Sequence, residues 1–297
     1  MEYRFEDAYP LFRRLVPMLD RIATGFTFTE GPIWRGDDLL FSDIPNSRTV
    51  RYRALREGPE ITTFRAPSGN ANGLTLDLHD DVLACEHSGR RVSRIRRDGS
   101  VEVVVDRYQG KRLNSPNDVV VRTDGAIFFT DPPYGLPRQT EGKELASNGV
   151  YRVDPGGGVT LLVDDFDRPN GLAFSPDERV LYIDDSARAH IRAFDVAPDG
   201  SLSNGRIWAE MKGGPGERGV PDGMKVDVEG NVYCTGAGGV WIFAANGRYL
   251  GRIHMPEVTA NLAWGGEDDR TLYLTATMSV YRIRLAVPGI PVGSRRR

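Results

Sequence analysis

The sequence has few of the features that mark disulfide-stapled, membrane-spanning or nucleic-acid-binding proteins. Only two cysteines occur in 297 residues, Cys85 and Cys234, and each lies in a short apolar run, which does not indicate a disulfide scaffold. No stretch approaches the roughly 20 apolar residues of a membrane span. The formal net charge is −3, so global charge favours neither nucleic acid nor an anionic membrane as a partner.

The chain termini add little that changes this picture. The N-terminal apolar run LVPML is too short for a secretory signal and is broken by Pro17. The one basic cluster, residues 295–297, is expected to be a solvated tail. We therefore expect a soluble, cytoplasmic protein and make no prediction of its oligomeric state.

What the sequence does contain is a long internal repeat. Six segments begin with a polar residue, continue as an apolar run and reach a polar turn, and their starting residues are 42, 45, 53, 52 and 39 positions apart. This spacing is typical of one four-stranded propeller blade. The six starting residues are Glu30, Asn72, Asn117, Asn170, Asp222 and Asn261.

Each turn is followed by a second apolar run that ends in a polar residue, 13 or 14 positions after the starting residue. These runs read LLFSD, VLACE, AIFFTD, VLYID, NVYCT and TLYLT. Third and fourth runs rich in Val, Ile, Tyr and Phe complete each unit, a composition that favours strands. A β-sandwich would also have short strands, but it would not show a fixed long period.

The repeat therefore predicts an all-β fold, a six-bladed β-propeller with four-stranded blades. We expect residues 1–21 to form a short N-terminal cap, residues 22–287 the propeller and residues 288–297 a C-terminal tail. Pairing of strands from the two ends should close the ring, because closure removes exposed sheet edges.

The first strand of each blade lines the central channel, so the six starting residues should form a ring at one mouth. All six are carboxylates or carboxamides. Buried carboxylates that face each other repel unless a cation lies between them, and oxygen-only ligands favour a hard ion such as Ca²⁺ or Mg²⁺. The competing interpretation is that Asn-Gly and Asp-Gly pairs form turns at the strand starts. It does not account for Glu30 or for Asn117, which precedes Asp118.

The segments EGPIW, SPNDVVV, RPNGLAFSPDE and PDGMKVDVEGN, in this order, closely resemble the family of gluconolactonase, senescence-marker protein and luciferin-regenerating enzyme. The resemblance covers about residues 22–285 and is strongest to the bacterial gluconolactonase branch, through FRAPSGNANGL, GKRLNSPNDVVV and FTDPPYG. In the animal senescence-marker branch an arginine stands two residues before the asparagine of PND, whereas this chain has Ser115.

The resemblance implies a six-bladed propeller with one divalent metal ion, held by Glu30, Asn170 and Asp222, with Asn117 as a further metal or substrate ligand. Ca²⁺ is the expected ion, and Mg²⁺, Mn²⁺, Zn²⁺ or Fe²⁺ are alternatives. The implied reaction is hydrolysis of a small-molecule sugar lactone to an aldonic acid. Asp118 is a candidate for a catalytic or metal-shell role.

Lactone hydrolysis needs a Lewis acid at the carbonyl and a base that activates water. Asp222 is the first candidate for the base and Asp118 the second; alternatively, the metal generates hydroxide and Asp222 only orients it. Polar residues near the mouth are candidates for binding the hydroxyl groups of the substrate. They are Asn72, Glu86, His87, Asp131, Tyr134 and Asn261.

Two other functions remain open at this point. A fluorophosphatase-like hydrolase would keep the fold and the oxygen-rich metal site but act on another substrate. A non-enzymatic propeller that binds a protein partner would instead show an exposed apolar patch and a degenerate channel ring.

Overall fold

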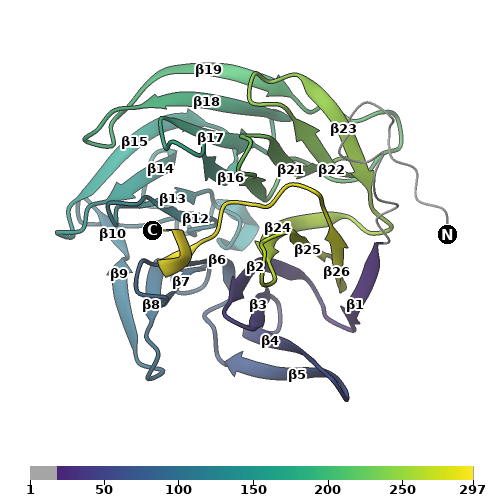
Figure 1. The fold of residues 1–297 in the computed structure, drawn as a ribbon. Helices are drawn as coiled ribbons and strands as arrows, with labels where there is room; N and C mark the ends of the chain where they lie inside the picture. Colours follow the sequence, from purple (N-terminus) through teal and green to yellow (C-terminus); the bar gives the residue numbers. More distant parts are fainter. Residues whose placement is uncertain (1–18, 297) are drawn as a thin grey trace.

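The computed structural model describes residues 19–296 as a closed ring of six four-stranded antiparallel sheets around a central channel (Figure 1). The prediction of a six-bladed propeller is confirmed. Among these described residues the only helices are two short 3-10 segments, Pro137–Gln139 and Gly293–Arg296. The predicted N-terminal cap lies almost entirely outside the described residues.

The strands of each blade run outward from the channel in chain order. Blade 1 contains β2 (Thr29–Arg35), β3 (Asp38–Asp43), β4 (Arg48–Leu55) and β5 (Gly58–Arg65). Blade 2 contains β6 (Ala71–Leu76), β7 (Val82–Glu86), β8 (Arg91–Ile95) and β9 (Val101–Val105). Blade 3 contains β12 (Val119–Val121), β13 (Ile127–Asp131), β14 (Asn148–Val153) and β15 (Val159–Phe166).

The remaining blades follow the same plan. Blade 4 contains β16 (Pro169–Phe174), β17 (Val180–Asp185), β18 (His190–Val196) and β19 (Leu202–Glu210). Blade 5 contains β20 (Met224–Val226), β21 (Val232–Gly236), β22 (Gly239–Phe243) and β23 (Tyr249–His254). Blade 6 contains β24 (Thr259–Gly265), β25 (Thr271–Ala276) and β26 (Ser279–Arg284). A separate hairpin of β10 (Arg107–Tyr108) and β11 (Lys111–Arg112) lies between blades 2 and 3.

The ring closes through the N-terminal strand, as predicted. Strand β1 (Asp20–Thr24) is the outermost strand of blade 6 and pairs antiparallel with β26, where Asp20 lies opposite Arg282. The side chains of these two residues also form an ion pair at 2.9 Å. Residues from the two ends of the chain thus share one sheet, and β1 covers the outer edge of β26, which would otherwise be unpaired.

The second strands are buried along nearly their whole length because neighbouring blades cover both of their faces. In β7 every residue of the run VLACE is buried. Leu83 and Cys85 of this strand pack in one cluster with Val119 and Phe129 of blade 3. The outermost strands face solvent, and six successive residues of β5 are exposed. This placement explains why the inner runs do not alternate between apolar and polar residues.

The C-terminal segment, residues 288–296, crosses the end of the channel opposite the starting residues, so the expectation of a solvated basic tail was wrong. Arg296 donates to the carbonyl oxygen of Val121 at 2.9 Å and pairs with Glu178 at 2.8 Å, and only 13% of its side chain is exposed. Ser294 donates both its amide and its hydroxyl to Asp80 at 2.8 Å.

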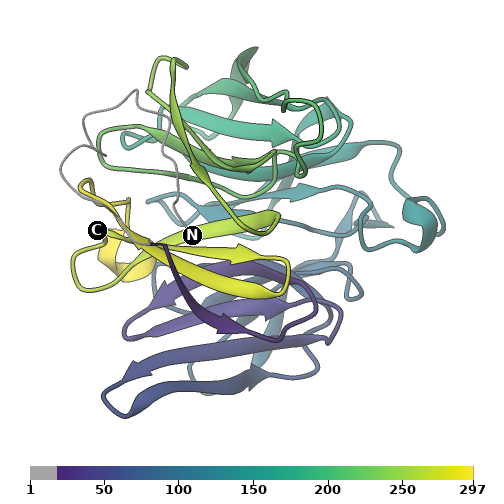
Figure 2. The same cartoon turned by 90° about the vertical axis from the view of Figure 1, so that its right-hand side faces the viewer.

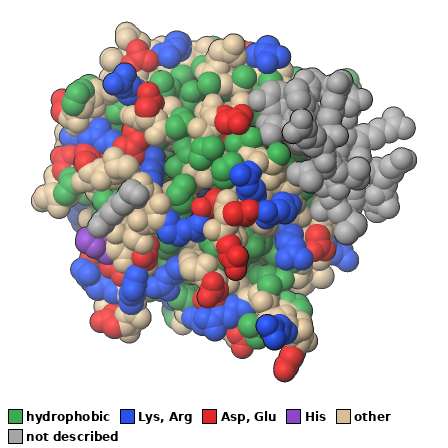
Figure 3. Space-filling model, in the orientation of Figure 1, with side chains coloured by type: hydrophobic (Ala, Val, Ile, Leu, Met, Phe, Trp, Pro, Cys, Tyr) green, Lys and Arg blue, Asp and Glu red, His purple; other side chains and the backbone are tan. Residues whose placement is uncertain are grey.

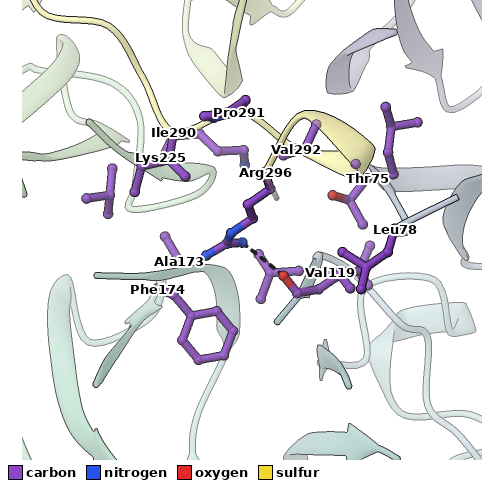
Figure 4. A pocket seen from close by; sticks show the side chains of 15 residues that line it. Thr75, Leu78, Val119, Ala173, Phe174, Lys225, Ile290, Pro291, Val292 and Arg296 are labelled. Atoms are coloured by element: carbon purple, nitrogen blue, oxygen red, sulfur yellow. Dashed lines mark hydrogen bonds between the residues drawn. The ribbon is translucent and has the colours of Figure 1, made fainter. Parts of the chain in front are cut away.

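This segment closes a cavity of about 50 Å³ on the channel axis (Figure 4). Val119, Phe174 and Lys225 line it from three different blades, and Ile290 and Arg296 cover it. Figure 3 shows acidic and basic side chains interspersed over the face that carries this segment. Contacts to several blades make the C-terminal segment a strap that holds the ring together at this end.

We predict that Gly289→Ala will destabilise the fold through this strap. A Cβ atom at Gly289 would lie 1.7 Å from Cγ of Trp264 in blade 6, so the strap would have to move away. We expect a loss of about 1–3 kcal/mol in the free energy of unfolding, measured by urea denaturation. Gly156→Ala is the matched control, because a Cβ there meets nothing within 4 Å. Equal stability of the two variants would contradict the role assigned to the strap.

Candidate functional site

The starting residues of the six blades converge on one cavity of about 270 Å³ at the mouth of the channel. Glu30, Asn72, Asn117, Asn170 and Asp222 all line it. The sixth, Asn261, is buried beside it. The structure therefore brings together the four residues predicted to hold a metal ion, from blades 1, 3, 4 and 5. The complete lining consists of Phe28, Glu30, Ile44, Asn72, His87, Asn117, Tyr134, Asn170, Val220 and Asp222.

The glycines after the starting residues serve close packing between blades, and they do not form turns. Gly171 lies in β16, and its amide donates to the carbonyl oxygen of Asp222 in the next blade at 2.9 Å. A Cβ atom at Gly171 would lie 2.0 Å from that oxygen. Gly73 makes the same contact with Asn117, donating at 2.8 Å. The turn interpretation of the Asn-Gly pairs was therefore wrong.

Glu30 is held by hydrogen bonds on one side of its carboxylate. Its Oε2 accepts from the amide of Gly31 at 2.6 Å and from Nδ2 of Asn261 at 2.9 Å. Asn261 in turn accepts from the amide of Leu262 at 2.8 Å, which fixes the orientation of its carboxamide. Asn261 thus holds the Glu30 carboxylate in place. It was predicted to bind substrate, but it is not part of the cavity lining. The Oε1 atom of Glu30 takes part in neither bond.

Four carboxyl groups share this end of the channel with too few counter-charges. Burial, together with the charge of Asp118, raises the pKa of Glu30 to about 7. Burial also raises the pKa of Asp118, and it raises those of Asp184 and Asp222 well above the usual range. Each of these shifts records a carboxylate that the surrounding protein stabilises poorly.

Asp118 and Asp184 lie behind the cavity lining. Asp118 accepts from the amide of Val119 at 2.9 Å, while its other oxygen, Oδ2, is buried without a hydrogen-bond partner. Oδ1 of Asp184 is likewise buried without a partner. Asp184, which ends a second strand, was not among the predicted site residues. Its signal in the sequence was the paired Asp184-Asp185 at a position where three other blades have a single acid and two have none.

The predicted substrate-binding residues separate into two groups. Asn72, His87 and Tyr134 line the cavity. Among the described residues, Glu86 and Asp131 stay outside its lining, so the prediction of substrate contact does not fit their placement. Glu86 pairs with Arg65 at 2.8 Å and with Arg91 at 2.7 Å.

Asp131 instead caps the loop that leads into its own blade. It accepts from the amides of Asn114 and Ser115 at 2.7 and 2.8 Å, and burial raises its pKa to about 7. Asp185 caps the corresponding loop of blade 4, accepting from the amides of residues 167 and 168. Acids at the ends of second strands thus hold the mouth loops in place, which a sequence pattern alone does not distinguish from substrate binding.

The loop between β13 and β14 forms one wall of the mouth. It contains Tyr134 and the Pro137–Gln139 helix, and Figure 2 shows it on the face opposite the C-terminal strap. Ser115 fixes the start of this loop: its hydroxyl donates to the carbonyl oxygen of Pro132 at 2.7 Å and accepts from the amide of Gly135 at 2.8 Å. Ser115 therefore has a structural role at the position where the animal branch has arginine.

Sequence reasoning missed the apolar half of the cavity. Phe28, Ile44 and Val220 form part of its lining, opposite in character to the carboxamides and carboxylates. These residues come from loops before or after the repeated strands, where no periodic pattern identifies them. The cavity can therefore bind a small molecule that has both polar groups and a C–H surface.

His87 is a neutral hydrogen-bonding group in this wall. Burial lowers its pKa to about 4. Its Nε2 lies 3.2 Å from Nδ2 of Asn72, and because a carboxamide nitrogen only donates, Nε2 accepts and the ring proton resides on Nδ1. This bond leaves Oδ1 of Asn72 buried without a partner.

The protein is thus a six-bladed propeller that has an acidic, carboxamide-lined cavity at one mouth of its channel. Residues 28–278 match the family model described as SMP-30/Gluconolactonase/LRE-like region, and the chain belongs to this family. The membership confirms the resemblance drawn from the sequence motifs.

Individual relatives agree with this assignment. The chain is 35% identical to a gluconolactonase of Zymomonas mobilis, over 90% of this chain and 81% of that protein. It is 31% identical to the pentonolactonase XacC of Haloferax volcanii, over 86% and 83% of the two chains. The crystallised gluconolactonase of Xanthomonas campestris superimposes with a TM-score of 0.86 at 34% identity, covering 96% of this chain and 95% of that one.

Two kinds of feature are absent from residues 19–296. No helix in this part of the chain is both long and apolar enough to span a membrane. No group of three or more His, Cys, Asp or Glu side chains there is arranged to hold a metal ion. A metal site at the mouth would therefore depend on Asn117 and Asn170 as well as on Glu30 and Asp222.

We predict that His87 makes the fold sensitive to acid. Its folded-state pKa of about 4 lies below the ordinary value of 6.5, so the unfolded chain binds more protons between these pH values. Stability is therefore lost as the pH falls from 6.5 toward 4, by about 2 kcal/mol at pH 4.5. Urea denaturation at pH 7 and pH 4.5 should show a smaller loss for His87→Gln than for the wild type. His79→Gln, at an exposed position, controls for loss of a histidine; if both variants lose as much stability as the wild type, the prediction is wrong.

Proposed function

We propose that the protein is a lactonase that opens sugar lactones to aldonic acids with the help of one divalent metal ion. The observation that carries the proposal is the convergence of Glu30, Asn117, Asn170 and Asp222 on one mouth cavity. The lactone-hydrolysing relatives, which cover most of this chain, support the reaction class. The cavity volume of about 270 Å³ suits a single sugar ring better than a polymer.

The residues at the mouth fit a hard divalent cation. Two carboxylates and two carboxamides offer only oxygen ligands, which Ca²⁺ favours and Mg²⁺ and Mn²⁺ also accept. The raised pKa values of Glu30 and Asp222 are what a cation-binding site is expected to show without its cation. Such an ion, when bound, supplies a Lewis acid that polarises the lactone carbonyl.

The side chains of the cavity would perform the remaining steps. Asp222 would take the proton from the attacking water, and its carboxylate is stabilised by a hydrogen bond from Asn170. Asn72, His87 and Tyr134 would bind the ring hydroxyls. Phe28, Ile44 and Val220 would pack against the C–H surface of the ring and limit access of water.

We predict that Asp222→Asn will lower kcat at least 100-fold, because an amide cannot accept the water proton at neutral pH. The assay is proton release from a panel of aldonolactones, corrected for spontaneous opening. Metal-stripped protein should be inactive, and restoring Ca²⁺, Mg²⁺ or Mn²⁺ singly should identify the preferred ion.

Asp227→Asn is the matched control in the same blade, since Asp227 is also buried but lies at the far end of blade 5. This variant should keep the wild-type kcat. A wild-type kcat in Asp222→Asn with metal bound would exclude Asp222 as the base. No turnover of any lactone with any ion would refute the lactonase.

Metal affinity should depend on pH because the ion must displace a proton from the site. The pKa of Glu30 is raised to about 7, so its carboxyl is mostly protonated at pH 6 and mostly ionised at pH 8. We expect apparent affinity to fall by about tenfold between pH 8 and pH 6, with proton release on binding. Isothermal titration calorimetry of metal-free protein measures both, and equal affinities at pH 6 and pH 8 would contradict the prediction.

A further inference from the structure

Ser186 is a buried hydroxyl that the proposed mechanism does not use. It follows β17 directly, in the turn toward β18, and only 6% of the residue is exposed. Its amide donates to the carbonyl oxygen of Arg168 at 3.0 Å, which holds the turn against the start of its own blade. The side chain instead contacts residues of the mouth site that belong to blades 3, 4 and 5.

The hydroxyl of Ser186 has both a donated and an accepted hydrogen bond. It donates to the carbonyl oxygen of Pro221 at 2.6 Å, immediately before Asp222 in the chain. It accepts from Nδ2 of Asn170 at 3.0 Å. Ser186 also interacts with the hydroxyl of Tyr134, and this interaction partly offsets burial, which raises the pKa of that tyrosine.

The donor count fixes the orientation of the Asn170 carboxamide. A serine hydroxyl has one hydrogen, and in Ser186 that hydrogen is engaged by Pro221. Toward Asn170 the hydroxyl can therefore only accept, so Asn170 must present its NH₂ group to Ser186. The carboxamide oxygen is thereby directed away from Ser186, and Asn170 lines the mouth cavity.

We propose that Ser186 is a positioning residue, which holds the Asn170 oxygen toward the metal position and ties the start of the Asp222 strand to the same point. This inference rests on the proposed function only in assuming a cation at the mouth. Ser186 connects ligands from blades 4 and 5 and the Tyr134 loop of blade 3 through one oxygen atom. Without it, Asn170 can rotate its NH₂ group into the cavity, where it repels a cation.

The test is calorimetric titration of metal-free, full-length protein with CaCl₂, MgCl₂ and MnCl₂, following the ion that the wild type binds most tightly. Ser186→Ala should weaken that affinity about 10- to 100-fold, the usual effect of losing a group that orients a metal ligand. Ser186→Thr keeps the hydroxyl and should restore most of the affinity. In the lactonase assay, saturating metal should restore much of the kcat lost in Ser186→Ala.

Ser175→Ala is the matched control. Ser175 is also a buried serine of blade 4, 7% exposed, and its hydroxyl both donates, to Asp177 at 2.7 Å, and accepts, from the amide of Val180 at 3.0 Å. It lies in the turn between β16 and β17, at the opposite end of the strands. Ser175→Ala should lower stability while it leaves metal affinity unchanged.

Metal affinity tests the role of Ser186, whereas lactone opening by the wild type tests the proposed function. Metal affinity of Ser186→Ala equal to that of the wild type would overturn the positioning role, whatever the activity. Wild-type protein that binds an ion but opens no lactone would refute the lactonase. The metal affinities of the wild type and Ser186→Ala would still show whether Ser186 positions Asn170. Wild-type protein that binds none of the three ions would overturn both.

Discussion

The site depends on hydrogen bonds that join each first strand to the next around the mouth of the channel. Blades 2 and 3 are joined by Gly73 and Asn117, and blades 4 and 5 by Gly171 and Asp222. Blades 1 and 6 are joined by the side chains of Glu30 and Asn261. Hydroxyl groups of second strands complete the ring between the other pairs: Ser42 donates to Asn72, Thr130 to Asn170 and Thr235 to Ala260.

These bonds have a consequence for the side chains of the starting residues. The bonds hold neighbouring first strands close together at the mouth, so the polar side chains of the starting residues that line the cavity are concentrated in one small space. Burial then raises the pKa values of Glu30, Asp118 and Asp222 together. The electrostatic strain of the mouth is thus a product of the same packing that closes the ring, and a divalent cation is the simplest group that relieves it.

The two ends of the channel are built differently. At the mouth, polar side chains from at least four blades face an open cavity, whereas at the far end the C-terminal strap covers a mostly apolar cavity. Access to the site is therefore from one side, past the Tyr134 loop. A small substrate that enters this way meets the carboxylates and carboxamides at the bottom of the cavity and the apolar residues on its wall.

Because the sequence repeats, the propeller fold and the meeting of the site residues at one mouth could be predicted from it. Equivalent positions in a propeller occupy equivalent places in space, so the spacing of Glu30, Asn170 and Asp222 was enough to predict that they would meet. The same periodicity predicted the four-stranded blades, and the apolar composition of β7 followed from burial between two blades. The family motifs added the reaction class, which no spacing could supply.

Other features depended on contacts that have no period. The sequence could not show that Asp131 caps a loop while Asn72 lines the cavity, because both are polar residues near a mouth and only their side-chain directions differ. It could not show that Arg296 is buried against Glu178, nor that Ser186 contacts Asn170, since residues far apart in the chain make both contacts. The repeat places these residues near the mouth of the channel, and this much can be predicted from the sequence. Which of them face the cavity is set by side-chain hydrogen bonds and ion pairs that the repeat does not specify, such as those that hold Asp131 and Glu86.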